Sequence, residues 1–268
     1  MNKKVKKAKS NKIKLTKKII FLLLLLLLIL LAIILNGNKI KNKLIPVYTL
    51  QDRTSNVEKY KKKYKNSNVI GWIKVQGTNI DIPIINYTQA GKIDNYAWMY
   101  DDIDSLKDYM PIFGHNIRNV ATPPAIGKNY MNRFEQLMSF IYSDFADENK
   151  YIQLTINGKN YLYQIYGVSI IDNTDIDTRY SDINDKNKDD YIKESINNSL
   201  YKYNVKVSNN DYLISLITCT RLYGRTDYSI KVDGKLVKNS NKGYNYDMHE
   251  KKNYKEIKKI LEGDGEDV

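Results

Sequence analysis

An unbroken apolar run of 17 residues, 19–35 (IIFLLLLLLLILLAIIL), divides this chain and confines any folded domain to the residues after it. As a helix the run would be roughly 25 Å long, close to the thickness of the hydrocarbon core of a bilayer. Residues 1–18 hold nine lysines and no acidic residue, which places the N-terminus in the cytoplasm by the positive-inside rule. We therefore expect a basic cytoplasmic tail over 1–18, a single-pass transmembrane anchor over 19–35 and an extracellular remainder at the cell membrane.

A cleaved signal peptide is the alternative interpretation of the same run. The run is long for the apolar part of a signal peptide. The residues after it, NGNKIKNK, contain no small-x-small cleavage site. Both observations favour an uncleaved anchor.

The strong positive charge of the chain belongs mainly to this tail. The net charge of +13 falls to +4 without the nine lysines of residues 1–18. We therefore expect no nucleic-acid partner. One cysteine and two histidines form no cluster with metal-ligand spacing, and no glycine-rich phosphate loop occurs, so we expect no metal and no cofactor.

Paired apolar runs separated by turn residues dominate the chain after the anchor. They lie in residues 66–87, in residues 150–172 around an Asn-Gly turn, and in residues 211–237. Helical patterns occupy residues 52–65, 133–145 and 189–203. The pattern predicts a mainly β, α+β domain with flanking helices and a closed or nearly closed sheet. We expect a linker and helix over 36–65, the folded domain over 66–238 and a polar tail over 239–268.

The single cysteine, Cys219, ends an apolar β-branched run, where a thiol is held rigidly and can still face solvent. A buried structural cysteine is the alternative. In an extracellular domain a lone cysteine has no internal disulfide partner, which makes it a candidate reactive thiol. His115 lies where another predicted strand gives way to a loop; a structural histidine is the alternative there.

Three motifs in this order resemble the sortase family, the membrane-anchored cysteine transpeptidases of Gram-positive bacteria. They are VIGWIKVQGTNIDIPII near the start of the domain, GHN around His115, and LITC before a strand that closes with GKLV. The resemblance covers about residues 66–237 and is strongest to class B. It implies a closed eight-stranded β-barrel with a cysteine, a histidine and an arginine at one end.

The resemblance also implies roles for individual residues. Cys219 would be the nucleophile, His115 its acid/base partner, and Arg225 a cationic donor beside the thioester oxygen. Other predicted substrate-binding residues are Thr218, Asn116, Ser229 and Arg221. The expected partners are the sorting-signal peptide of a secreted surface protein and an amine of a peptidoglycan precursor or a pilin subunit.

The sequence departs from the class B pattern at the arginine. That residue usually stands five positions before the glycine of the closing Gly-Lys-Leu, and Ser229 occupies this place here. Arg225 is four residues earlier, roughly 13 Å along an unbroken strand, and Arg221 is earlier still. This departure supports one alternative, a sortase-like domain that serves as a binding or assembly module. A cysteine hydrolase is a second alternative, because water and an amine differ only in which nucleophile reaches the thioester.

Overall fold

The computed structural model describes residues 18, 20–28, 30–31, 45–64, 68–86, 95–100, 105–116, 133–174, 176–181, 183–224 and 227–262. The chain divides into two compact units, residues 1–45 and residues 46–268. Described residues of the first unit between 18 and 31 are helical. Within the described parts of the chain, no helix is both long and apolar enough to cross a membrane. The anchor predicted over 19–35 lies partly outside the described residues and stays a prediction.

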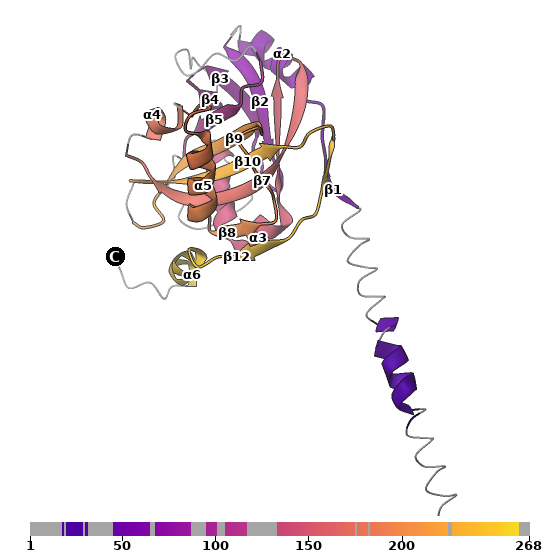
Figure 1. The fold of residues 1–268 in the computed structure, drawn as a ribbon. Helices are drawn as coiled ribbons and strands as arrows, with labels where there is room; N and C mark the ends of the chain where they lie inside the picture. The colour runs from indigo at the N-terminus through magenta and orange to yellow at the C-terminus, as the bar shows by residue number, and fades with distance from the viewer. Residues whose placement is uncertain are drawn as a thin grey trace, which may run out of the picture. The chain divides into compact units, whose positions relative to one another are not determined.

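The second unit is built from short strands with helices between them (Figure 1). Its strands are β1 (Pro46–Thr49), β2 (Val69–Val75), β3 (Asp81–Asn86), β4 (Ala97–Met99), β5 (Tyr109–Gly114), β6 (Tyr151–Ile156), β7 (Lys159–Asp172), β8 (Tyr201–Tyr203), β9 (Leu213–Thr220), β10 (Tyr228–Leu236), β11 (Lys242–Tyr244) and β12 (Met248–Glu250). Its helices are α2 (Thr54–Tyr64), the 3₁₀ helix η2 (Arg133–Ile141), α3 (Ser143–Glu148), α4 (Ile176–Ser181), α5 (Lys188–Asn198) and α6 (Tyr254–Glu262).

Eight of these strands close into a barrel in the order β10-β7-β6-β2-β3-β4-β5-β9. The pairs β3–β4 and β5–β9 are parallel, and the other pairs are antiparallel. The predicted mainly β fold with flanking helices and a closed eight-stranded barrel is confirmed. The parallel pair β5–β9 determines the site, because it brings together segments about a hundred residues apart.

Successive residues of the barrel strands alternate between two apolar cores, as the period of two in a strand requires. Ile112 and Leu216 point into the inner core, together with side chains from the 3₁₀ helix η2. Phe113 and Ile217, one residue later in each strand, lie in the outer core beneath α2 and α5. Figure 1 shows α5 lying across the barrel strands on this outer side. The parity of a residue therefore decides which side of the barrel wall it faces.

The hairpin of β6 and β7 is confirmed at its predicted turn, where Asn157 and Gly158 have φ of 46° and 67°. Other predictions were incomplete. The amphipathic segment 133–145 is a 3₁₀ helix followed by the short helix α3 rather than one α-helix. The short strand β4 and the helix α4 were not predicted, and the helix expected over 189–203 ends at Asn198, before β8.

The segment after the barrel folds onto the same unit up to residue 262. β11 pairs with β1, and β12 pairs with β8. Helix α6 buries Tyr254 and Ile257, which are spaced three residues apart on one face, in the inner core cluster. The polar composition that set residues 239–268 apart as a tail reflects the exposed faces of these elements. Residues 263–268 lie outside the described part of the chain.

Candidate active site

Strand parity brings Cys219 and His115 to the outer side of the barrel wall. In the parallel pair β5–β9, Phe113 pairs with Ile217, and both belong to the outer core. His115 and Cys219 each come two residues later, so they share that side. His115 directly follows the last residue of β5, and Cys219 lies near the end of β9, so the two residues lie at adjoining strand ends. Both side chains are exposed.

Two side-chain hydrogen bonds fasten the ends of these strands together. The amide Nδ2 of Asn116 donates to the carbonyl oxygen of Cys219 at 2.8 Å. The hydroxyl of Thr218 donates to the carbonyl oxygen of Gly114 at 2.7 Å. Asn116 and Thr218 are themselves buried. These two predicted substrate-binding residues thus hold the loop that carries His115 against the strand that carries Cys219.

Gly114 lets the end of β5 lie directly against the inner core. A Cβ at this position would come within 2.2 Å of ring atoms of Phe134 from η2. Any larger side chain would displace Phe134 or the strand, and His115 is the next residue. The close approach therefore contributes to the placement of the imidazole.

Cys219 and His115 open into one cavity of about 290 Å³. Among the described residues its lining is mostly aromatic and aliphatic, without an aspartate, glutamate, lysine or arginine. The lining consists of Trp98, Tyr100, Phe113, Gly114, His115, Asn173, Ile176, Ile217, Thr218, Cys219 and Ser229. A thiol and an imidazole at the edge of an apolar hollow can bind a peptide segment and attack its carbonyl.

Aromatic rings surround His115 on the β4 side. The centroid of the Trp98 ring lies 4.5 Å from that of the imidazole, and the Tyr96 ring lies 6.5 Å away. Desolvation by these surroundings lowers the pKa of His115, because burial disfavours the charged form. His115 is therefore neutral at neutral pH and ready to accept a proton. Sequence reasoning missed Trp98, although it is one of two tryptophans in the chain and stands in a polar segment.

A neutral pair stands opposite the thiol. Ser229 of β10, at the position where the resemblance predicts the class B arginine, pairs directly with Cys219 of β9. Its hydroxyl donates to Oδ1 of Asn173 at 2.6 Å, and Nδ2 of Asn173 donates to the carbonyl oxygen of Tyr228 at 3.1 Å. Asn173, just after β7, was not foreseen, because only the barrel pairing brings it here.

The two candidate arginines come after β9 in the chain. Arg221 is exposed and is not among the described residues that line the cavity. Arg225 lies outside the described residues, so its predicted role stays a prediction.

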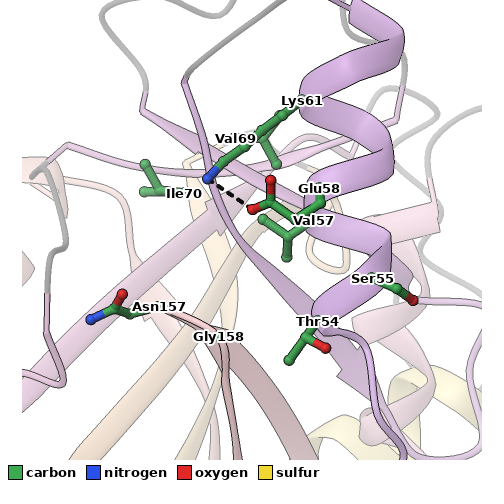
Figure 2. Close-up of a pocket in the computed structure, with 9 residues that line it drawn as sticks. All are labelled: Thr54, Ser55, Val57, Glu58, Lys61, Val69, Ile70, Asn157 and Gly158. Carbon is green, nitrogen blue, oxygen red and sulfur yellow. Dashed lines mark hydrogen bonds and ion pairs between the residues drawn. The ribbon is translucent and has the colours of Figure 1, made fainter.

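A larger hollow of about 490 Å³ lies elsewhere, between α2, the start of β2 and the β6–β7 turn. Figure 2 shows Lys61 and Glu58 on α2 joined by an ion pair, whose Nζ and Oε1 atoms are 3.3 Å apart, with Asn157 and Gly158 on the turn. No thiol or imidazole is among the described residues that line this hollow, so we assign the chemistry to the cavity at Cys219.

Comparisons with known proteins agree with this assignment, although no family model matches the chain. Sortase B of Staphylococcus aureus is 22% identical over 188 residues, which are 65% of this chain and 72% of the relative. Sortase B of Listeria monocytogenes is 25% identical over 193 residues, which are 64% of this chain and 71% of the relative. The crystal structure of Clostridium perfringens sortase B superposes with a TM-score of 0.52 and 27% identity, covering 67% of this chain and 99% of that one. In sequence and in fold, the chain is therefore similar to class B sortases.

Proposed function

We propose that the chain is a membrane-anchored cysteine transpeptidase that cleaves a C-terminal sorting signal and transfers the acyl group to an amine. The observation that carries this proposal is the shared cavity of Cys219 and His115, held at the adjoining ends of β9 and β5. The fold and the sortase B relatives support the same reaction class.

The reaction would run through an acyl-thioester. The Cys219 thiol gives its proton to the neutral imidazole of His115 as the sulfur attacks a peptide carbonyl. The imidazolium then protonates the leaving amine as the C–N bond breaks. An incoming amine returns the enzyme to its first state by the reverse proton transfers.

The proposal includes the place where the reaction happens and its partners. The lysines of residues 1–18 and the apolar run over 19–35 support a single-pass anchor with a cytoplasmic N-terminus and an extracellular catalytic domain. There the donor would be a secreted surface protein, and the acceptor an amine of a peptidoglycan precursor or a pilin subunit.

The proposal is tested by intact mass spectrometry of the full-length chain in detergent. The protein is incubated with a panel of sorting-type peptides, with and without triglycine or a diaminopimelate-type amine. We expect a peptide acyl adduct on Cys219 without the amine, and its discharge as ligated product when the amine is added. An adduct that water alone discharges would establish the hydrolase alternative instead. No adduct with any peptide, while an alkylating reagent still modifies Cys219, would argue against the transpeptidase.

A cationic donor from the loop after β9 is the second testable part of the proposal. Loss of one donor to a developing oxyanion typically lowers kcat by about 10²–10³-fold. We expect this loss in Arg225→Ala, measured as adduct formation rate, and little change in Arg221→Ala. Arg179→Ala, which removes an exposed arginine paired with Glu194, is the control. A loss confined to Arg221→Ala would move the role to Arg221, and full activity of both variants would refute a loop arginine.

The binding-module alternative draws its support from Ser229, because a neutral side chain faces the thiol where an arginine is usual in class B. It predicts peptide binding without an adduct on Cys219. The mass measurement above therefore separates the two hypotheses.

A further inference from the structure

The indole of Trp98 is the nearest side-chain ring to the imidazole among the aromatic contacts of His115. The two ring centroids are 4.5 Å apart and the ring planes are inclined by 46°. Tyr96 approaches the same imidazole at 6.5 Å, with its ring plane inclined by 73°. His115 therefore lies against a face built by the residues of β4 and the segment just before it.

The barrel holds Trp98 rigidly. Trp98 is the middle residue of β4, and it pairs directly with Phe113 of β5. Its ring stacks on that of Phe113, with centroids 6.2 Å apart and planes 24° from parallel. Only 8% of Trp98 is exposed, because it belongs to the outer core. A ring fixed in this way can determine where the exposed imidazole lies.

A general base needs a third group that orients it. Within the described part of the chain, we find no hydrogen bond between His115 and a carboxylate or carbonyl oxygen that could do this. The titratable groups that face His115 are Tyr96, from the segment before β4, Tyr100, from the cavity wall, and Cys219, from β9. Charged side chains are missing from the described cavity lining, which leaves the aromatic contacts as the described interactions of the imidazole ring.

We propose that Trp98 is the positioning residue for His115, whose imidazole it holds beside Cys219 while the proton moves to and from the ring. The indole fits both stages of that transfer. Its apolar bulk excludes water from one side of the neutral imidazole, and its negatively charged π face attracts the ring once the ring is positive. This proposal rests on the proposed function for the identity of the reaction, but the contact itself can be measured without any substrate.

The test observes the imidazole directly by NMR in the full-length protein in detergent, with ¹³C-labelled histidine. The chain has only two histidines, His115 and His249, so a His249→Gln variant assigns both signals. In the unsubstituted protein we expect nuclear Overhauser effects between the indole of Trp98 and the ring protons of His115. Their absence would overturn the proposal even if every Trp98 variant failed to fold.

Variants then separate positioning from general stability. Trp98→Leu removes the ring, and we expect the pKa of His115 to rise toward its ordinary value because solvent reaches the imidazole. We also expect kcat to fall by about 10–100-fold with little change in KM, as for a displaced catalytic group. The acidic limb of the pH–rate profile should shift to higher pH together with the pKa of His115. Trp98→Phe, which keeps an aromatic ring, should restore most of both properties.

Trp72→Phe is the matched control, because it shortens the other tryptophan of the chain. Trp72 is also buried, and its indole donates a hydrogen bond to Asp81 at 2.6 Å. The contacts described for Trp72 do not include His115. We expect it to lower stability without moving the His115 titration. An unchanged His115 titration in Trp98→Leu, or an equal shift in Trp72→Phe, would overturn the proposal. If the unsubstituted protein processes no peptide but the NMR results hold, the proposed function fails while the positioning role of Trp98 stands.

Discussion

Replacing Cys219 by alanine is expected to abolish the acyl adduct and to lower turnover on the order of 10⁴-fold or more, the scale seen when a covalent nucleophile is removed. Cys219 is the only cysteine, so no second thiol can take over. The side chain is exposed at the end of β9, and the substitution leaves the hydrogen bond from Asn116 to its backbone carbonyl in place. The measurement is intact mass after incubation with peptide, together with the rate of product formation.

The fold should survive this substitution almost unchanged. Exposed substitutions away from special contacts change stability by about 0.5 kcal/mol or less. Denaturant unfolding of Cys219→Ala should therefore match the unsubstituted protein. Product formation at a normal rate by the alanine variant would show that another group is the nucleophile, and the proposed function would have to be abandoned.

The second large effect, on stability, is expected at Asp233 of β10, which accepts hydrogen bonds from the other members of a buried polar cluster. Its Oδ2 accepts from Nζ of Lys231 at 2.7 Å, and its Oδ1 accepts from Tyr191 and Ser215, each at 2.6 Å. The side chains of Asp233 and Lys231 are 0% and 3% exposed. Lys231 also donates to Ser195 at 2.7 Å and lies 4.6 Å from the ring centroid of Tyr191. The cluster thereby ties α5 to β9 and β10.

Asp233→Ala should lower the free energy of unfolding by about 3–5 kcal/mol, because it leaves the Lys231 ammonium buried without its carboxylate. Two buried hydroxyl groups lose their acceptor as well. For a domain whose total stability is about 5–15 kcal/mol, this is a large fraction. Urea denaturation followed by tryptophan fluorescence measures it.

An exposed ion pair in helix α5 provides the control. Asp190 and Lys193 are 83% and 71% exposed, and Asp190→Ala should cost less than about 1 kcal/mol. A double change, Lys231→Met with Asp233→Leu, should recover much of the loss, because it removes the charge and its partner together. A loss in Asp233→Ala no larger than in Asp190→Ala would mean that the buried pair contributes no net stability.

Local patterns carried most of the fold prediction. The hairpin at Asn157 and Gly158 was predictable because both turn positions need positive φ, which these residues tolerate. The strands β9 and β10 were predictable from long runs of apolar and β-branched residues. The missed strands β4 and β8 have three residues each and lie in polar segments. Such strands form because a neighbouring strand offers hydrogen-bonding partners, and no local pattern records that neighbour.

The candidate site divides in the same way. Cys219 and His115 could be selected by residue type, because few side chains can act as nucleophile or base near neutral pH. Sequence reasoning could not place Trp98 or Asn173 in the site, nor predict the pairing of Ser229 with Cys219. These features depend on the pairing of distant segments when the barrel closes. Asn116 and Thr218 were selected as substrate-binding residues, and the structure places them in the bonds that join β5 to β9.

The pairing of β1 with β11 has a mechanical consequence. The first unit ends at Ile45, and β1 begins at the next residue, Pro46. Tension applied to the chain before Pro46 would therefore reach the second unit through the two-stranded ribbon of β1 and β11. Tyr48 stacks on Tyr151, and Gln153 accepts a hydrogen bond from the backbone of Gln51, so the load is passed on to β6. The ribbon and its contacts with β6 are therefore the first part of this unit that such tension would load. A recombinant fragment that starts after β1 would lose it.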